Sequence, residues 1–393
     1  MADKEGFRRV AEWIRSDDQI KAIVLSAGGK AKGSKKVTDL LLDASQLIVK
    51  GESISKALNP FLERVISDAE AIGLVSLIKD ELMTIGQEVE KDSSLDFILS
   101  RGEYFYAKLF AGYYGLPFID SARLIGFYSN GRLNMGLSEF QIEKAYEKQG
   151  KFVCGGFYGS LSNGKIKTFT RGGSDFSGAI VARGIKAGEY LNFTDVDGIF
   201  PFLPTKENCL PIKEICFDTV RLLGEFGTTV LHPASVLPLY GTGTQITVKN
   251  TFNKCAQGTL IKEESNERPF AAAIKSECRF LKIIKRGKGY ELYSRLVKEG
   301  GKIICGACSF DFVEICIEDD PQEMSLNAKD LDFCQIQEDV SVFYLTPCEK
   351  TAMSVKRLQS LQIALFIGVF DYGAYVAVKE NYKNQAQKAI FEN

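Results

Sequence analysis

Three features that often identify the class of a protein are scarce or missing in this 393-residue chain. It has a single histidine, His232, and no second cysteine pair that could complete a zinc site with Cys305 and Cys308. No apolar run approaches the roughly 20 residues that a membrane-spanning helix needs. Neither charge is in surplus, because 49 Lys and Arg residues stand against 50 Asp and Glu residues. A nucleic-acid-binding or membrane-surface protein is therefore not expected.

The remaining bulk properties predict a cytoplasmic enzyme or regulator. Ten cysteines occur without regular spacing, which is typical of buried thiols in a reducing compartment. The isolated C-x-x-C at 305–308 is interpreted as structural, since a thioredoxin-like context is missing. The first residues, MADKEGFRRV, are charged and unlike a signal peptide. The length allows two or three domains with a substantial buried core.

Residues 168–200 contain two loops that predict a ligand site. The first loop, Arg171 to Asp175, carries glycines that let the backbone come close to a ligand, and it precedes a helix predicted to start at Ser174 or Asp175. Free N–H groups at the start of that helix, its positive dipole end and the charge of Arg171 indicate an anion site. The second loop, Thr194 to Gly198, follows a predicted strand, where ligands bind in open α/β sheets.

Strands and helices alternate through the first 262 residues, which predicts an α/β domain with a mainly parallel sheet. The predicted helices cover residues 5–16, several segments between 39 and 115, a segment from Ser138, and residues 211–226. The predicted strands cover residues 22–25, 118–120, 152–154, 230–231 and 245–249. Thr38 or Asp39 is expected to cap one helix, and a capping box at Ser138 to start another. The lysine-rich loop at 27–37 has the composition of a phosphate-binding loop but not the Walker order, so a solvated loop is an equal alternative.

The last part of the chain, residues 263–393, has a different rhythm. Predicted strands at 279–284, 302–307, 312–317, 341–345, 363–369 and 374–378 alternate with helix patterns at 289–299, 349–360 and 380–391. This is a β-α-β-β order written twice, as expected of two small α+β ferredoxin-like units. Because these units carry no evident catalytic groups, regulation is the natural expectation.

Seven motifs in a fixed order give the chain a resemblance to a known family. They are VLSAGG with VTDLL (24–41), SRGE (100–103), GGFYGS (155–160), TRGGSD (170–175), TDVDGI (194–199), GTTVLHP (227–233) and VKNT with GTLI (248–261). The chain resembles the aspartate kinases of the amino-acid kinase superfamily, which carry a tandem ACT-type regulatory region. The resemblance implies a three-layer kinase domain at 1–262 and a regulatory region at 263–393.

The resemblance also implies an activity. It is the transfer of the γ-phosphate of ATP, with Mg²⁺, to the side-chain carboxylate of L-aspartate, giving 4-phospho-L-aspartate. This is the first step of lysine, threonine and methionine biosynthesis. An aspartate carboxylate has a pKa of about 4 and is ionised at neutral pH, so no general base is needed. The expected partners are lysine or threonine as feedback effector and a second copy of the chain in a homodimer or higher homo-oligomer.

Individual residues take their expected roles from the family motifs. Arg171 would pair with a substrate carboxylate, Glu103 would take the substrate ammonium, and Asp175 would orient the site around the phosphates. The expected substrate site is completed by Ser26, Thr38, Gly172, Gly173 and Ser174, and the expected nucleotide site consists of Thr194, Asp195, Gly198 and Phe200. No metal ligand is assigned to the chain.

Three departures from the family pattern leave alternatives open. Met1 aligns with residues just after the first strand of the family and its KFGG-type segment, whose lysine binds phosphate, so an incomplete kinase domain is expected. Phe200 replaces an adenine-stacking tyrosine, Thr205 replaces an arginine, and Thr229 replaces a lysine. One alternative is a catalytically impaired regulatory protein. Another is an amino-acid kinase that acts on a different carboxylate.

Overall fold

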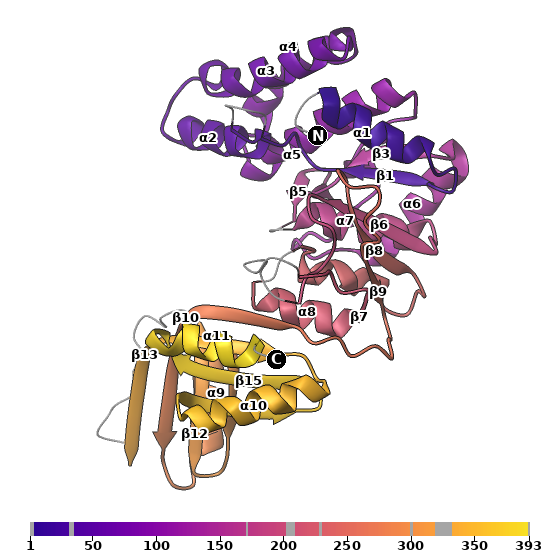
Figure 1. Ribbon diagram of the computed structural model, residues 1–393. Helices are drawn as coiled ribbons and strands as arrows, with labels where there is room; N and C mark the ends of the chain where they lie inside the picture. Colours follow the sequence, from indigo (N-terminus) through magenta and orange to yellow (C-terminus); the bar gives the residue numbers. More distant parts are fainter. Residues whose placement is uncertain are drawn as a thin grey trace. The chain divides into compact units, whose positions relative to one another are not determined.

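The computed structural model describes residues 4–30, 35–169, 172–201, 209–227, 230–298, 302–318 and 332–391. These residues fold as two compact units (Figure 1). The first unit comprises residues 1–198 and 230–263, and the second comprises residues 199–229 and 264–393. The chain therefore leaves the first unit after Gly198, returns to it at Val230, and leaves it again after Glu263.

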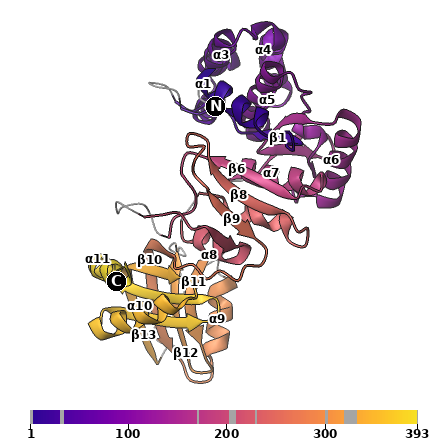
Figure 2. The same cartoon turned by 45° about the vertical axis from the view of Figure 1, so that its right-hand side comes forward.

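Parallel strand pairs form the centre of the first unit. Strand β1 (Ala22–Leu25) runs parallel to β3 (Phe152–Gly155), with Leu25 opposite Gly155. Strand β2 (Gly126–Phe127) runs parallel to β4 (Tyr158–Leu161), which is antiparallel to β5 (Ile166–Thr168). Figure 2 shows β6 (Glu189–Thr194), β8 (Gln245–Asn250) and β9 (Thr259–Lys262) side by side. The β6–β8 pair is parallel and the β8–β9 pair is antiparallel, so the expected mainly parallel α/β class is confirmed.

Helices cover both faces of the β1–β3 pair, because the side chains of a strand point alternately to opposite faces. Ile23 and Leu25 join one buried cluster with helices α1 to α5, whereas Val24 and Cys154 join another cluster with α6 and α7. This is the three-layer arrangement that was expected. The helices of this unit are α1 (Lys4–Arg15), α2 (Val37–Val49), α3 (Ile54–Ala71), α4 (Val75–Lys91), α5 (Leu95–Tyr114), α6 (Met135–Gln149) and α7 (Gly173–Gly184), with the short 3₁₀ helices η1 (Ser121–Arg123) and η2 (Pro233–Leu239).

Several predicted helix starts were wrong by a few residues. Helix α2 begins at Val37, so Thr38 and Asp39 lie inside its first turn and do not cap it. Helix α6 begins at Met135, because the side chain of Asn134 accepts the N–H of Leu137 and caps the helix there. The hydroxyl of Ser138 donates to the carbonyl of Asn134 from within the helix. Side chains of this kind can bond backward in a helix as readily as they cap one.

Three other expected elements also differ from the structure. Residues 118–120 contribute a single bridge, Phe118 to Val153, and not a strand. Residues 230–231 are a bend that leads into η2. The helix expected at 211–226 is shorter, because residues 214–216 form strand β7 (Glu214–Cys216) and α8 (Phe217–Glu225) begins only after it.

The second unit contains one six-stranded antiparallel sheet in the order β11-β12-β10-β13-β15-β14. This order is symmetric about the central β10–β13 pair, so each half is one β-α-β-β repeat and the predicted repeat is confirmed. The elements are β10 (Ala272–Ile284), α9 (Gly289–Lys298), β11 (Lys302–Cys308), β12 (Phe312–Glu318), β13 (Phe333–Leu345), α10 (Glu349–Leu361), β14 (Ala364–Phe370), β15 (Gly373–Lys379), η4 (Glu380–Tyr382) and α11 (Lys383–Phe391).

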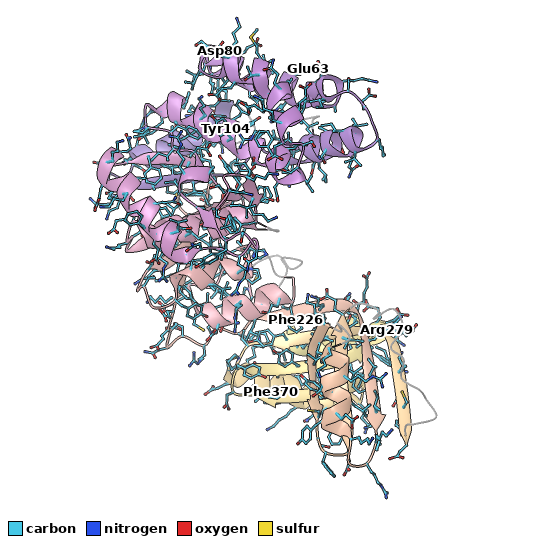
Figure 3. All side chains as sticks on the ribbon, turned by 180° about the vertical axis from the view of Figure 1, so that it is seen from behind. Glu63, Asp80, Tyr104, Phe226, Arg279 and Phe370 are labelled. Atoms are coloured by element: carbon cyan, nitrogen blue, oxygen red, sulfur yellow. The ribbon has the colours of Figure 1, made fainter. Side chains whose placement is uncertain are left out.

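The end of helix α8 also contacts this sheet. Phe226, which directly follows α8, is labelled in Figure 3. Its ring lies 5.6 Å from the ring of Tyr344 and 5.7 Å from that of Tyr375. The ammonium of Lys275 donates to the carbonyl oxygen of Glu225 at 3.1 Å. Aromatic pairs at such distances add to the burial of apolar area. The end of α8 is therefore packed as part of the second unit.

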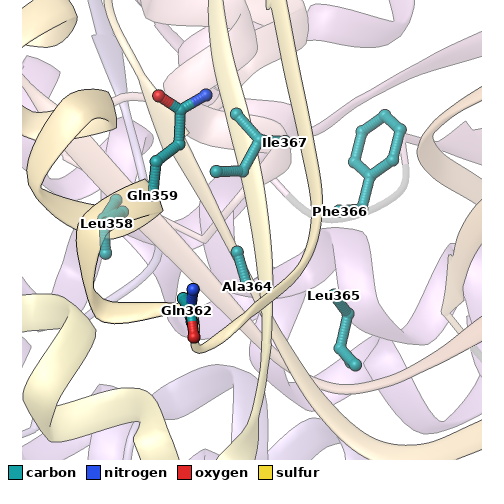
Figure 4. A pocket seen from close by; sticks show the side chains of 7 residues that line it. All are labelled: Leu358, Gln359, Gln362, Ala364, Leu365, Phe366 and Ile367. Atoms are coloured by element: carbon teal, nitrogen blue, oxygen red, sulfur yellow. The ribbon is translucent and has the colours of Figure 1, made fainter.

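The outer strand β14 borders an open pocket of about 230 Å³ (Figure 4). The pocket is lined by Leu358, Gln359, Gln362, Ala364, Leu365, Phe366 and Ile367, so no charged side chain lines it. All ten cysteines are free thiols. Cys305 and Cys308 both belong to β11, where residues three apart point to opposite faces. Among the described helices, none has both the length and the apolar composition to cross a bilayer.

Candidate active site

The start of helix α7 packs closely against two other segments, where glycines leave room for the contact. Gly172 caps the helix in the left-handed region with φ 74°, and a Cβ there would lie 2.1 Å from Cγ of His232. A Cβ on Gly156 would lie 2.8 Å from Cα of Ser174. Helix α7 begins at Gly173, one residue before Ser174 and two before Asp175, the two expected starts. Its first N–H groups have no partner within the helix, so they can bind an anion.

The strand that leads into this loop is fixed by Asp96, at the beginning of α5. The carboxylate of Asp96 accepts the N–H of Thr168 at 3.1 Å and pairs with the ammonium of Lys167 at 2.8 Å. Asp96 also accepts the hydroxyl of Thr168. Sequence reasoning missed this residue, because nothing in its local pattern points to a partner some seventy residues away. The predicted anion-binding residue Arg171 lies outside the described residues.

Asp175, in the first turn of α7, has one donor on each carboxylate oxygen. The side-chain amide of Asn192 donates to Oδ1 at 3.0 Å, and the backbone N–H of His232 donates to Oδ2 at 3.2 Å. The hydroxyl of Tyr190 donates to the carbonyl oxygen of Asp175 at 3.3 Å. A polar Asn in the middle of strand β6 was the signal that could have revealed this contact. The orientation of the Asp175 carboxylate is thus set by β6 and by the segment before η2.

His232 has a structural part in this arrangement, at the start of η2. Its Nδ1 atom accepts the N–H of Ala234 at 3.3 Å and so caps η2. The Asp175 carboxylate is bound by the backbone N–H of His232 and not by its imidazole ring. The only histidine of the chain therefore needs no role as a base in the site.

Glu103 is a buried carboxylate with spare hydrogen-bonding capacity. Its residue is 3% exposed on α5, and Oε2 is fully enclosed without a hydrogen-bond partner. Burial raises the pKa of Glu103 to about 8, against the opposite effect of hydrogen bonds with the backbone of Glu103 and Ala27. A buried acceptor without a partner costs stability, so its retention indicates a ligand that donates to it.

Glu103 lies beside the glycine loop that reaches the start of α7. A Cβ on Gly155 would lie 3.0 Å from the carbonyl oxygen of Glu103, and the next residue, Gly156, faces Ser174. The N–H of Gly156 donates to the carbonyl of Leu25 at 2.8 Å, which places it next to Ser26. Thr38 is the second residue of α2, half-buried, and Ser26 is exposed. The structure therefore brings the neighbourhoods of Glu103, Ser174 and Ser26 together.

The expected nucleotide loop follows strand β6. Thr194 ends the strand, and the loop then contacts the end of β8 and the segment after it. The side-chain amides of Asn250 and Asn253 donate to Oδ1 of Asp197 at 2.7 and 3.1 Å. Asp195 is exposed, and its Oδ1 accepts the hydroxyl of Thr194 at 3.3 Å. Phe200 belongs to the second unit, whereas Thr205 and Thr229 fall outside the described residues.

The described part of the chain contains no group of three or more His, Cys, Asp or Glu side chains arranged to hold a metal ion. Within the site, Asp175 has both oxygens engaged and Asp195 is exposed at the loop.

Comparison with protein families decides the group to which the chain belongs. The sequence model of the amino acid kinase family matches residues 1–250. The chain is a member of the amino acid kinase family. The matched range includes every residue that was expected in the substrate and nucleotide sites.

Within this family the chain is similar to aspartokinases. It is 30% identical over 292 residues to aspartokinase 3 of Bacillus subtilis, which covers 70% of this chain and 64% of that protein. It is 29% identical over 237 residues to the aspartokinase of Chlamydia pneumoniae, which covers 57% of this chain and 54% of that one. The matched region therefore spans less than two thirds of the length of these relatives.

Solved structures resemble this member of the family over nearly its whole length. The aspartate kinase of Clostridium acetobutylicum superposes with a TM-score of 0.86 at 27% identity, covering 99% of this chain and 96% of that chain. Aspartokinase III of Escherichia coli, in complex with aspartate and ADP, superposes with a TM-score of 0.79 over 99% of this chain and 96% of that chain. At 20% identity the second likeness is one of fold.

Proposed function

We propose that this amino acid kinase is an aspartate kinase, which transfers the γ-phosphate of ATP to the side-chain carboxylate of L-aspartate. The observation that carries the proposal is Oε2 of Glu103, a buried acceptor without a partner beside the start of α7. An α-amino acid brings an ammonium for that oxygen and a carboxylate for the helix N-terminus. The similarity to aspartokinases supports L-aspartate as the amino acid.

Each proposed residue then has a defined task. Glu103 binds the substrate ammonium, while Ser26 and Thr38 line the pocket on the other side of Ala27. The α-carboxylate lies against the N–H groups of Gly173 and Ser174, with Arg171 as its charged partner and Gly172 as the cap that brings the backbone close. These assignments follow the family motifs and the arrangement of the described residues around Gly155 and Gly156.

The reaction needs positioning and charge neutralisation more than proton transfer. A side-chain oxygen of the ionised substrate attacks the γ-phosphorus, the bond to the β,γ-bridging oxygen breaks, and ADP leaves with that electron pair. The product is 4-phospho-L-aspartate. Asp175, held by Asn192 and His232, orients the site around the phosphates. Thr194, Asp195, Gly198 and Phe200 form the nucleotide side. Mg²⁺ bound to the nucleotide would lie near Asp195 and would neutralise phosphate charge.

We propose regulation by an amino acid at the ACT-type region, residues 263–393. The family suggests lysine or threonine. The pocket beside β14 is of a size for a small amino acid, and its lining offers two side-chain amides but no carboxylate. A lysine ammonium placed there would find no carboxylate in the lining to pair with. The composition of this pocket therefore supports threonine.

We also propose a homodimer. Strand β14 is the last strand of its sheet, carries no charged residue, and exposes Val369 by 65%. Uncharged apolar edge strands of this kind associate with other strands, and a two-fold axis allows β14 to pair with its own copy. Light scattering of wild type and of Val369→Lys tests the proposal. A dimer that persists in the variant at equal concentration would assign the interface to another surface.

An assay that traps acyl phosphates as hydroxamates, with ATP and L-aspartate, tests the activity. The expected result is aspartyl hydroxamate from the wild type, none above background from Glu103→Gln, and normal amounts from Glu63→Gln, an exposed glutamate on α3. Preference for glutamate or its N-acetyl form would support a different amino-acid kinase. Absence of product with all three acids would refute the kinase assignment.

A further inference from the structure

Arg64, on helix α3, holds the lysine-rich loop by both of its ends. Its Nη2 donates to the carbonyl of Gly29 at 3.1 Å, and its Nη1 donates to the carbonyl of Lys35 at 3.4 Å. The side chain is only 10% exposed, and its Nε pairs with Oδ2 of Asp68 at 2.8 Å. One planar guanidinium thus connects two points of the chain that are six residues apart, which a lysine ammonium cannot do in the same geometry.

Two further contacts show that the Arg64 contact is part of a built support. The hydroxyl of Tyr106 donates to the same oxygen of Asp68, so Asp68 is oriented from two sides. The Tyr106 ring lies against Gly28, where a Cβ would be 2.2 Å away, and the N–H of Val37 donates to the carbonyl of Gly28 at 3.1 Å. The loop is therefore closed at its base, between Ser26 and Thr38.

This loop borders the pocket that would hold the substrate ammonium. A Cβ on Gly102 would lie 3.0 Å from Cβ of Ala27, so Ala27 lies against the turn of α5 that carries Glu103. Ser26 precedes Ala27, and Thr38 follows the second end of the loop. A shift of the loop base would therefore move the aspartate side of the site. The described contacts of Arg64 do not reach the loop after β6.

Trp13, the single tryptophan of the chain, makes an equivalent contact on the other side. Its indole N–H donates to the carbonyl of Thr251 at 3.1 Å, and its ring lies 5.1 Å from that of Phe193. The ammonium of Lys254 lies 5.4 Å from the centre of the same ring. Helix α1 is thereby attached to the end of β6 and to the segment after β8.

The residues that Trp13 holds are those that hold the expected nucleotide loop. Thr251 donates to the carbonyl of Thr194 through its N–H at 2.8 Å and through its hydroxyl at 3.0 Å. Its neighbour Asn250 donates to Asp197 at 2.7 Å. A displacement of Thr251 would therefore reach Thr194 directly and Asp197 through Asn250.

We propose that Arg64 and Trp13 are positioning residues, each for one substrate of the reaction: Arg64 for L-aspartate and Trp13 for the nucleotide. Neither residue belongs to the expected site, and neither touches the substrate in this assignment. The inference rests on the proposed function, because it names the two sides of the same site. It predicts that a change at Arg64 affects the binding of L-aspartate alone, and that a change at Trp13 affects the binding of the nucleotide alone.

Titration calorimetry on the full chain separates them, with L-aspartate and Mg·ADP as the two probes. In Arg64→Lys the dissociation constant of L-aspartate should rise about tenfold, since charge-assisted hydrogen bonds to the loop are lost, while that of Mg·ADP stays within twofold. In Trp13→Phe the ring contact with Phe193 is retained and one hydrogen bond is lost. The dissociation constant of Mg·ADP should then rise about fivefold, and that of L-aspartate should stay within twofold.

Each variant is the control for the other. A general loss of structure would weaken both ligands together, so equal losses in either variant overturn the inference. Unchanged affinities in both variants overturn it as well. A wild type that binds neither probe would refute the proposed function and this inference with it.

Discussion

The backbone N–H of His232 and the side-chain amide of Asn192 come from two different elements, and each donates to one carboxylate oxygen of Asp175. The donors approach Oδ2 at 3.2 Å and Oδ1 at 3.0 Å. One donor comes from the segment before η2 and the other from strand β6, so the carboxylate cannot rotate without losing a bond. Asp175 is therefore a pre-oriented charge at the start of α7.

Replacing Asn192 by leucine, which has a similar shape, removes one donor and leaves the fold of β6 in place. We expect kcat to fall about 10- to 100-fold, because catalytic groups are sensitive to small misplacements. The KM values for ATP and L-aspartate should change less than threefold. Steady-state kinetics checks this. A variant with normal kcat would show that the orientation of Asp175 does not limit the reaction.

Binding of L-aspartate should release a proton from Glu103. The pKa of Glu103 is raised to about 8 by burial, so the side chain is largely protonated at pH 7 in the free protein. A substrate ammonium at Oε2 favours the ionised form and expels the proton. The affinity for L-aspartate should accordingly increase from pH 6 to pH 8. Calorimetry at pH 7 in buffers of different ionisation enthalpy measures the proton, and Glu103→Gln should release none.

The same group makes stability depend on pH. Its folded pKa lies above its value of 4.5 in the unfolded chain, so the folded state binds more protons between pH 4.5 and 8. The contribution of Glu103 to stability is complete below pH 4.5 and is lost as the pH rises through 8. Denaturant titrations between pH 5 and 8 should show that the free energy of unfolding falls by a few kcal/mol more in wild type than in Glu103→Gln. One pKa unit corresponds to about 1.4 kcal/mol. If the free energies of unfolding of the two proteins changed in parallel with pH, a group other than Glu103 would be responsible for the pH dependence.

Gly172→Ala should damage the site through two separate effects. The left-handed backbone costs a residue with a side chain about 1 kcal/mol, and the new Cβ would lie 2.1 Å from the His232 ring. We expect a lower melting temperature and a loss of activity. His232→Gly keeps the N–H that binds Asp175 but removes the whole side chain, including the Cβ that would lie 2.3 Å from the new methyl group, so the double variant should recover part of the stability. A simple sum of the two single effects would mean that the collision does not matter.

The pocket beside β14 gives a prediction for the effector. L-threonine should raise the melting temperature of the full chain and L-lysine should raise it less, because the lining contains no carboxylate. Ala364→Phe, which fills the pocket, should remove the effect of threonine. If lysine stabilises the chain and Ala364→Phe leaves that effect unchanged, the effector binds at another place in the regulatory region.

Patterns that repeat along the chain predicted the fold well, whereas single capping residues did not. The β-α-β-β rhythm of residues 263–393 is confirmed because it depends on many apolar positions at once. The start of α6 was wrong because Asn134 caps the helix in place of Ser138, and the start of α2 was wrong because this helix begins after Lys36 without any side-chain cap. The helix expected at 211–226 was too long because Ile215 and Cys216 pair in a strand, which helical spacing alone does not reveal.

For the candidate site, too, some residues could be predicted from the sequence and others could not. The motif residues around Glu103 and Gly172 could be named from the sequence because the family retains their order. The burial of Glu103 could not, because it depends on β3 and on the loop after β1, which are distant in sequence. Asp96, Asn192 and Asn250 were missed for the same reason: their partners lie between 17 and 72 residues away.

The path of the backbone limits how this protein can be divided or recombined. The chain crosses between its compact units after residues 198, 229 and 263, and the excursion at 199–229 ends with Phe226 packed on Tyr344 and Tyr375. A fragment that stops at 263 would leave that ring without its partners while its neighbours are still joined to the loop of Asp197 and to the segment of His232. A chimaera that exchanges the regulatory sheet must therefore graft two stretches of sequence, and a single fusion point cannot preserve the packing.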